Sequence, residues 1–248
     1  MKKVIAVLGF LILLTCDSEK ANDCIQTSGP IIQQEFQVET FTKILVNRGI
    51  ELILKQEDDF EVIVEVGENL LNDISINVIE EQLVLTDNNN CNYFRDYEST
   101  KVYVSAPNIT EIRSSTQYDI SSYGALNYSN LELFSDDFFA PDSYTIGDFR
   151  LIVSCEELRI LTNNLSSQYI SGTTNKLNIN FASGAGRFEG GNLVAQEVFV
   201  NHRGSNDMIV NPQQSLTGIL RGTGNLISVN EPPIVDVERL YTGQLIFN

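Results

Sequence analysis

The sequence contains no tryptophan, one histidine and two methionines among 248 residues, and it has 16 basic residues against 33 acidic ones. The shortage of lysine and arginine gives a formal net charge of −17, which argues against nucleic acid and anionic lipid headgroups as electrostatic partners. Because the cysteines lie far apart and the one histidine adjoins none of them, we expect no metal site and no other cofactor. No apolar run is long enough to span a bilayer as a permanent helix.

The N-terminus has the features of an export signal. Lys2 and Lys3 precede an apolar run from Val4 to Leu14, and Cys16 follows directly. A cysteine at that place resembles the lipobox of bacterial lipoproteins, in which a signal peptidase cuts before the cysteine and the thiol carries a diacylglycerol. The pattern predicts three segments: a signal peptide (1–15), a lipidated tether (16–32) and a folded domain (33–248).

Lipidation at Cys16 would attach the protein to a membrane through acyl chains and place it in the cell envelope. We expect the outer membrane, on its periplasmic face or at the cell surface, rather than the inner membrane. Asp17 favours inner-membrane retention under the enteric sorting rule, whereas other envelope systems read acidic residues there as a surface-export signal. The alternatives to lipidation are an ordinary secretory signal with an accidental cysteine, or an uncleaved anchor.

Three further cysteines would meet an oxidising environment outside the cytoplasm. Cys24 in "NDCIQ" and Cys91 in "NNNCNY" both lie in polar, turn-like sequence, so we expect a disulfide between them. Such a bridge stabilises a fold by roughly 4 kcal/mol on the chain-entropy model. Cys155 in "LIVSCEEL" lies in an apolar–polar alternation and is predicted to be a buried free thiol.

Apolar and polar residues alternate along most of the chain. The stretch "FEVIVEV" puts Phe60 and three valines on one face, and "ISINV", "QLVLT" and "KVYVSA" repeat the pattern. No segment keeps an apolar 3.6-residue period over ten residues. The chain is therefore predicted to be all-β.

The second half of the chain contains imperfect repeats around glycine. The segments "SGAGRF", "RGSNDM" and "RGTGNL" align on Gly184, Gly204 and Gly222. Two positions later stand residues of the types that most easily take a left-handed backbone conformation, and two later again stand apolar residues. The first set is Gly186, Asn206 and Gly224, and the second is Phe188, Met208 and Leu226. The pattern predicts a corner followed by an inward side chain.

Corners near a twenty-residue period are typical of a β-solenoid, whose coils stack because none can bury its apolar face alone. We expect a right-handed parallel β-helix or β-solenoid-like stack. Antiparallel strands between about residues 33 and 105 would cover one end, and the segment with Pro232 and Pro233 would close the other. A β-sandwich is the alternative fold.

His202 in "NHRGSNDMIVNP" is the one position that suggests acid–base chemistry. In the repeat register it takes the place of Ala182 and Leu220, so we expect a neutral histidine that closes an apolar strip and bonds to backbone. A catalytic role would need a partner, and only Asp207 is near in sequence. The glycine-rich segment 184–191 lacks the helix that a phosphate-binding loop requires, and is interpreted as a coil corner.

An acidic segment, residues 134–143, contains Asp136, Asp137 and Asp142. Carboxylates on a β-helix can act as acid and base on a glycan, or bind calcium through oxygen ligands. The plainer interpretation is a solvated loop whose charge limits association between sheet edges. We therefore assign no catalytic residue, and keep the cluster as the site that a glycan-active enzyme would use.

Three blocks of sequence resemble one family: "KVYVSAPNITEIRSSTQYDI", "LNINFASGAGRFEGGNLVAQEVFVNHRGSNDMIVNP" and "LRGTGNLISVNEPPIV". Together they look like the head GIN domain, a family described as putative autotransporter adhesin heads, over roughly residues 35–246. The resemblance implies an exported envelope protein with a β-solenoid-like fold, and it supplies no catalytic residues. We expect a lipid-anchored, non-enzymatic protein whose head binds a protein or glycan. The alternatives are a glycan-active enzyme and a purely structural envelope protein.

Overall fold

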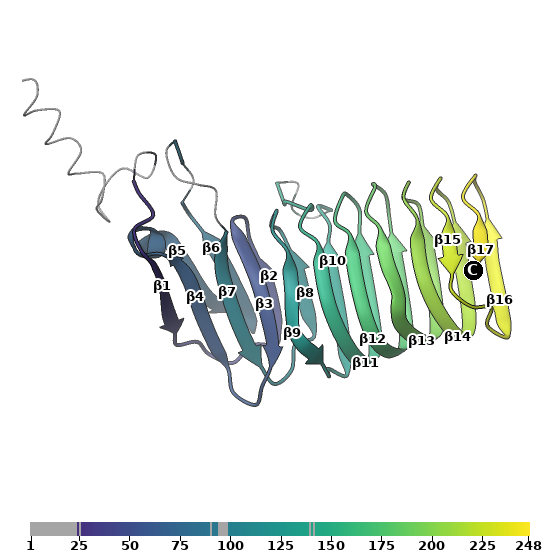
Figure 1. The fold of residues 1–248 in the computed structure, drawn as a ribbon, viewed down its shortest axis with the longest axis horizontal. Coiled ribbons are helices and arrows are strands. Elements are labelled where there is room, and N and C mark those ends of the chain that lie inside the picture. The colour runs from purple at the N-terminus through teal and green to yellow at the C-terminus, as the bar shows by residue number, and fades with distance from the viewer. Residues whose placement is uncertain (1–23, 25, 90, 94–98, 139, 141) are drawn as a thin grey trace, which may run out of the picture.

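The computed structural model describes residues 24, 26–89, 91–93, 99–138, 140 and 142–248. In these residues 17 strands stack along one long axis, with β1 near one end and the C-terminus at the other (Figure 1). The predicted all-β, solenoid-like fold is confirmed. The signal segment and Cys16 lie outside the described residues.

Four long strands form the regular part of the stack: β11 (Phe149–Thr162), β12 (Gln168–Phe181), β13 (Phe188–His202) and β14 (Met208–Leu220). Consecutive strands pair in parallel along both halves of their length. Each strand crosses from one layer of the stack to the other, and a short corner then leads to the next coil. This parallel pairing differs from the antiparallel β-sandwich that was the alternative.

Shorter strands make up the remaining coils. The N-terminal ones are β1 (Ile31–Phe36), β2 (Lys43–Val46), β3 (Ile50–Gln56), β4 (Glu61–Gly67), β5 (Ile74–Ile79), β6 (Gln82–Asp87), β7 (Thr100–Ala106), β8 (Glu111–Ser114), β9 (Ile120–Leu126) and β10 (Asn130–Ser135). The C-terminal ones are β15 (Leu226–Ser228), β16 (Ile234–Arg239) and β17 (Leu245–Phe247). One short 3-10 helix, η1 (Glu68–Asp73), lies between β4 and β5.

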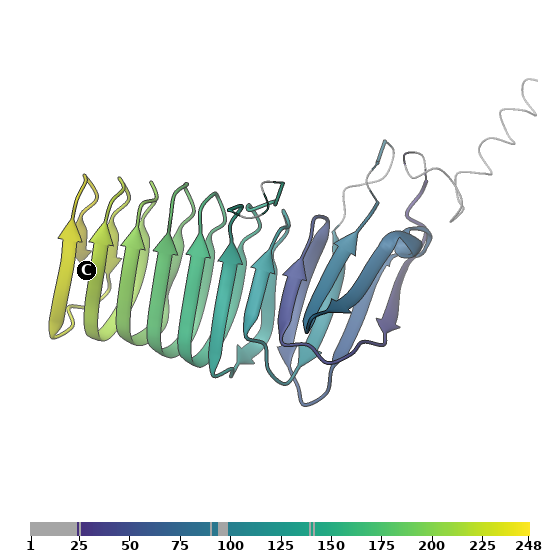
Figure 2. The same ribbon diagram turned by 180° about the vertical axis from the view of Figure 1, so that it is seen from behind.

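Two layers face each other across the core. The first layer runs in the order β1, β4, β7, β3, β9, the first halves of β11 to β14, β15 and β17. The second runs β5, β6, β2, β8, β10, the second halves of β11 to β14, and β16. Figure 2 shows β5 and β6 in the N-terminal part of the second layer.

The N-terminal part is less antiparallel than predicted. The strands β1, β4 and β5 make antiparallel pairs alone, β6 and β7 pair antiparallel on one side and parallel on the other, and β2 and β3 already belong to the parallel stack. The coil of β2 and β3 lies between β6–β7 and β8–β9, so chain order and spatial order differ there. Side-chain alternation cannot predict this insertion, because every one of these strands has the same pattern.

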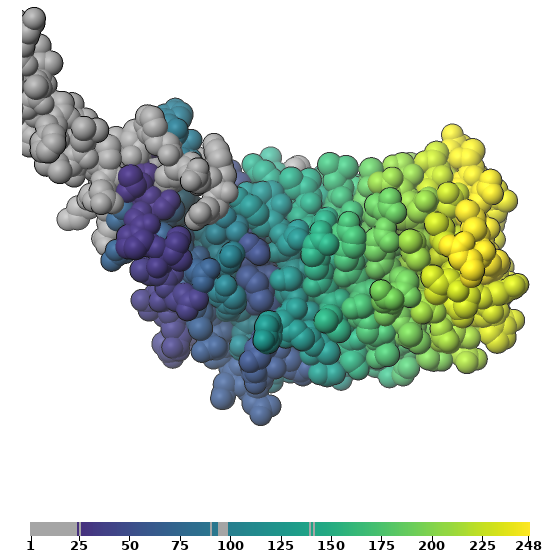
Figure 3. Space-filling model, in the orientation of Figure 1, coloured from purple at the N-terminus to yellow at the C-terminus, as the bar shows by residue number. Residues whose placement is uncertain are grey.

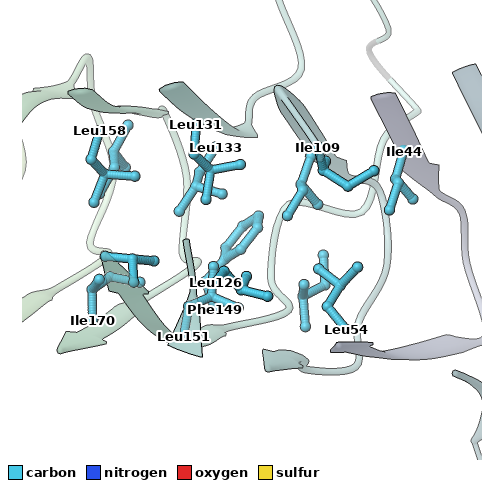
Figure 4. Close-up of a cluster of buried hydrophobic side chains, with 14 of the residues drawn as sticks. Ile44, Leu54, Ile109, Leu126, Leu131, Leu133, Phe149, Leu151, Leu158 and Ile170 are labelled. Carbon is cyan, nitrogen blue, oxygen red and sulfur yellow. The ribbon is translucent and has the colours of Figure 1, made fainter. Parts of the chain in front are cut away.

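The core is a continuous apolar column between the layers. Leu158 and Leu131 come from the second layer, and Ile170 and Leu151 come from the first, with their side chains directed toward one another (Figure 4). All four side chains are buried. Alternating residues of each strand therefore explain both the column and the polar outer faces.

The two ends of the column differ. At the N-terminal end Leu70 and Leu71 of η1 pack against the core. At the C-terminal end, β16 pairs with β14 and β17 pairs with β15, and no other described strand pairs with either. The atoms of this last coil form the blunt end of the molecule in Figure 3.

Candidate functional site

His202, the first candidate for chemistry, lies at the end of β13 with its side chain fully buried. Its Nε2–H donates to the carbonyl of Asn206 at 2.8 Å, and its Nδ1 accepts the amide proton of Gly204 at 3.3 Å. The ring packs edge-on against Phe181, with 6.0 Å between ring centroids. Both nitrogens are thus bound to the corner that follows the strand.

Burial lowers the pKa of His202 below the ordinary histidine value, although the bond to Asn206 and the charge of Asp207 act in the opposite direction. The imidazole is therefore neutral at pH 7. A general acid or base must reach a substrate proton, and this ring is closed off from solvent. The expected structural role fits this environment.

The register around His202 differs from the predicted one. The residue paired with His202 in the preceding coil is Phe181 rather than Ala182, while Leu220 pairs with it in the following coil as expected. The corner 182–187 has one residue more than the corner 203–207, and this shifts the alignment. An alignment of the repeats on their glycines cannot detect an additional residue that lies between the end of a strand and the glycine that follows it.

The corner glycines are required by close contact between coils. A Cβ at Gly186 would lie 2.2 Å from the carbonyl oxygen of Ser166, and one at Gly222 would lie 2.2 Å from that of Gly204. At Gly224 the Cβ would lie 2.0 Å from the Asn206 oxygen. Real Cβ atoms do not approach so closely, so glycine is required at these three positions.

Among the six corner residues named above, Gly184 alone has a left-handed backbone, with φ of +90°, and we did not expect it at that position. Gly186, Asn206 and Gly224 have no positive φ. Gly184 lies in the longer corner, where the additional residue needs the left-handed turn. The left-handed conformation that we expected at Gly186, Asn206 and Gly224 is therefore absent at all three.

A ladder of polar side chains joins the corners, and the sequence repeats do not reveal it. Asp148 Oδ1 accepts the amide proton of Ser167 at 2.9 Å, and Asp207 Oδ1 accepts that of Asn225 at the same distance. Asn225 Oδ1 in turn accepts the amide proton of Gln244 at 3.0 Å. Asp207 thus holds the next coil. It is not a catalytic partner of His202.

The acidic segment does not form a paired-carboxylate site. Asp136 is buried, and its Oδ2 binds Arg113 Nη1 at 2.6 Å. Asp137 Oδ1 accepts a hydrogen bond from Asn163 at 2.6 Å, and Asp142 is exposed. Five cavities are well defined in the described part of the chain, and none of the three aspartates lines any of these five. This arrangement does not favour the glycan-active enzyme.

Cys24 and Cys91 are joined by a disulfide, the pairing that we expected. Cys155 is a free thiol at the bend of β11, but it is half-buried rather than buried, because the strand changes layers there. Burial raises the pKa of the Cys155 thiol, and its Sγ donates to Thr174 Oγ1 at 3.5 Å. Among the described residues no group of three or more His, Cys, Asp or Glu side chains could hold a metal ion.

A polar cavity of about 800 Å³ lies near the disulfide. Its polar groups bind one another: Thr100 Oγ1 donates to Asp87 at 2.6 Å, and Ser99 Oγ donates to Glu51 at 2.7 Å. Since these groups are already hydrogen-bonded, they hold the N-terminal coils together.

A groove of about 770 Å³ on the outer face of the first layer offers a different surface. Its floor is a row across three adjacent strands, in which Tyr103 of β7 stands between Ile63 of β4 and Ile53 of β3. Tyr123 of β9 lines the groove beside this row and is 72% exposed. Ile53, Ile63 and Tyr103 are half-buried, and partly exposed aromatic and aliphatic side chains of this kind are typical of ligand sites.

Charged residues surround this floor. Lys55 Nζ forms an ion pair with Glu57 and lies 6.0 Å from the centroid of the Tyr123 ring. These contacts raise the pKa of Lys55, with the bond to Glu57 as the main cause. Five carboxylates line the groove: Glu35, Glu57, Asp58, Asp59 and Glu61. We call this surface, with Ile53, Ile63, Tyr103 and Tyr123 as its floor, the aromatic groove.

The aromatic groove cannot be recognised in the sequence, because the residues that line it are spread from position 33 to position 123. Each of its strands shows only an ordinary outward-facing residue in an alternating pattern. Within the described part of the chain, no helix is long and apolar enough to cross a membrane.

Comparison with known proteins gives a consistent result. A family model described as putative auto-transporter adhesin, head GIN domain, matches residues 40–232. A putative adhesin from Bacteroides fragilis has a similar structure, with a TM-score of 0.79 at 18% identity over 90% of this chain and 99% of that chain. No curated protein sequence matches this one.

Two further solved structures are similar. A putative adhesin from Parabacteroides merdae has a TM-score of 0.63 at 14% identity, over 89% of this chain and 97% of that chain. A putative lipid binding protein from Parabacteroides distasonis has a TM-score of 0.59 at 14% identity, with the same coverage of each chain. At such identities the likeness concerns the fold.

Proposed function

The chain belongs to the head GIN domain family of putative auto-transporter adhesins, and from this premise we propose that it is a non-enzymatic, adhesive or ligand-binding head of the cell envelope. The partner is a protein or a glycan outside the cell membrane. Nucleic acid does not suit a surface with a net charge of −17.

The aromatic groove is the observation that carries this proposal. Tyr103 and Tyr123 offer apolar ring faces at small conformational cost, since a tyrosine side chain has few rotatable bonds. The surrounding carboxylates accept hydrogen bonds from hydroxyl or amine groups of a ligand. A rigid stack of strands supports the groove, so little ordering is needed on binding.

The proposal includes a lipid anchor at Cys16 and a location at the outer membrane. Its support is the order of Lys2, Lys3, the apolar run and the cysteine at the N-terminus. The segment between Cys16 and the first described strand, which begins at Ile31, would hold the head away from the bilayer. Fatty-acid labelling in cells tests this directly. Cys16→Ser is expected to abolish labelling and membrane fractionation, and an unchanged result would refute the anchor.

Binding by the head is tested with residues 17–248, tagged at the C-terminus, on panels of bacterial and host glycans and of envelope and matrix proteins. A double variant, Tyr103→Ala with Tyr123→Ala, should lose binding because the groove loses its aromatic floor. Phe199→Ala is the matched control, since Phe199 is 43% exposed on β13 outside the groove. Binding that survives the double variant would show that the groove is not the site, and hydrolysis of a panel glycan would contradict the non-enzymatic assignment.

A further inference from the structure

The last coil presents unpaired backbone edges. Among the described strands, β16 pairs only with β14 and β17 pairs only with β15. The amide of Leu240, just after β16, donates to the carbonyl of Leu220 in the β14 layer. Since successive residues of a strand point their backbone groups in opposite directions, the N–H groups of Val235, Val237 and Arg239 point outward.

The apolar column of the core continues to this edge. Val235 and Val237 are in register with the buried Leu216 and Gly218, so they stand on the core side of β16. Val235 is nevertheless 39% exposed. On the other layer Phe247 is in register with the buried Ser228 and is 38% exposed. Another strand laid along the edge would bury these side chains.

The opposite end of the stack is covered more fully. The edge strand β1 has Gln34 on its core side, in register with Val64, and β16 likewise has Arg239 there, in register with the buried Leu220, so one polar residue interrupts the apolar row at each end. The ends differ in the 3-10 helix η1, whose Leu70 and Leu71 pack against the core at the N-terminal end. The C-terminal edge is therefore the better template for an added strand.

Charge decides what kind of strand fits. Asp236 and Glu238 stand on the outer side of β16, in register with Thr217 and Ile219. If β16 paired antiparallel with β16 of a second copy, registers centred on Val237, Asp236 or Glu238 would set carboxylate against carboxylate. Like charges directly opposite each other destabilise a strand pair. Pairing with the uncharged β17 of a second copy would leave both carboxylates without a cation.

We propose that the edge of β16 is a strand-addition site for an extended segment of a partner protein, with apolar residues facing the core and lysine or arginine at the alternating positions. Backbone bonds to Val235 and Val237 hold the segment, and ion pairs with Asp236 and Glu238 select it. The proposal deepens the proposed function by giving the head a partner of stated chemistry, and it rests on that function.

The probe is a fluorescent hexapeptide of alternating lysine and valine, titrated into residues 17–248 and followed by anisotropy. A hexapeptide with three lysines followed by three valines has the same charge and serves as the control for general attraction to an acidic protein. The alternating peptide should bind about tenfold more tightly than the block peptide. Equal affinities would overturn the proposal.

Two variants locate the binding. Val237→Pro removes one outward N–H while leaving the bonds to β14 intact, and it should abolish the preference for the alternating peptide. Asp236→Lys with Glu238→Lys changes only exposed side chains, and it should reverse selectivity toward a glutamate–valine hexapeptide. If the proline variant fails to fold, the charge-reversed variant still tests the proposal. Unchanged peptide selectivity in the charge-reversed variant would overturn it.

Sedimentation of the same sample shows whether the edge is occupied by a second copy of this chain instead of a segment of a partner protein. A monomer at the concentrations used for binding supports a foreign segment, whereas a dimer that Val237→Pro dissociates would assign the edge to a second copy. Failure of strand addition can be distinguished from failure of the proposed function. If binding to the panels is lost in the groove variant but kept in Val237→Pro, the head is a binding module and strand addition is refuted.

Discussion

At the N-terminal end of the stack, Leu70 and Leu71 pack against the core and a disulfide joins Cys24 to Cys91, whereas the C-terminal end has neither feature. Its last inward side chains, Val235 and Phe247, are both more than a third exposed. Both ends terminate the same two layers, so the geometry of the coil alone does not explain why the ends differ. The N-terminal end is thus the more strongly held of the two, and the C-terminal end is the one at which we propose contact with a partner.

The largest expected effect comes from removing the disulfide at the N-terminal end. Cys24→Ser with Cys91→Ser should lower the free energy of unfolding by about 4 kcal/mol, because the bridge closes a loop with a sequence separation of 67. Denaturant titration of the oxidised protein and the variant measures this. A free-thiol count after denaturation should find Cys155 alone in the oxidised mature domain. Equal stability of the two proteins would mean that the disulfide does not hold this end.

Truncating one inward side chain at each end compares the ends directly. Leu85 of β6 is fully buried, so Leu85→Ala should cost about 3 kcal/mol. Phe247→Ala removes a larger side chain from the open end, yet it should cost less than about 1 kcal/mol because the ring is already partly solvated. If the two costs were equal, the C-terminal end would be as well packed as the N-terminal one.

The corner glycines test how the coils next to the open end are held. Gly224→Ala should cost about 3 kcal/mol, since its Cβ would meet the Asn206 oxygen at 2.0 Å and His202 Nε2 at 2.4 Å. Gly191→Ala is the matched control, because its Cβ would make only ordinary contacts, the nearest at 3.4 Å with Ile209. Thermal unfolding should show the control as stable as the parent or slightly more so.

The smallest effect concerns the pH dependence of His202. Because burial lowers the pKa of the folded state, the unfolded chain takes up a proton first as the pH falls below about 6.5. Stability should therefore be complete above that pH and decline below it, by at most about 1.4 kcal/mol per pH unit for one proton.

The variant His202→Leu isolates this contribution from that of the carboxylates. At pH 7 it should remain folded and cost about 1–2 kcal/mol, because Gly204 and Asn206 lose their hydrogen-bonding partner. The deficit should shrink as the pH falls from 7 to 5, since leucine takes up no proton. If the folded variant lost a measured binding or enzymatic activity, His202 would have a role beyond its structural one at the corner.

Much of the regular part of the fold can be predicted from the sequence, because each coil repeats the same requirements. Gly204 and Gly222 mark corners, and Met208 and Leu226 mark the first inward side chain after them. The register ahead of a corner is less predictable, as the pairing of His202 with Phe181 shows. One additional residue in a corner moves the preceding strand without altering the glycine spacing.

The candidate sites could not be predicted, for two physical reasons. Tyr103 and Tyr123 come together only through the order of strands, and the insertion of β2 and β3 is invisible in an alternating pattern. Asp136 looked like part of a solvated acidic loop, but the structure buries it against Arg113, a partner that lies 23 residues away in the chain. Sequence proximity therefore suggested an acidic site where the fold makes an ion pair.

Native-state hydrogen exchange of residues 17–248, with and without the alternating lysine–valine peptide, tests the difference between the ends most directly. The free protein should exchange quickly at the outward amides of Val235 and Val237 and slowly in β4 and β6, and the peptide should slow exchange in β16 alone. Slow exchange throughout β16 in the free monomer, or peptide protection confined to other strands, would contradict the account of an open C-terminal end.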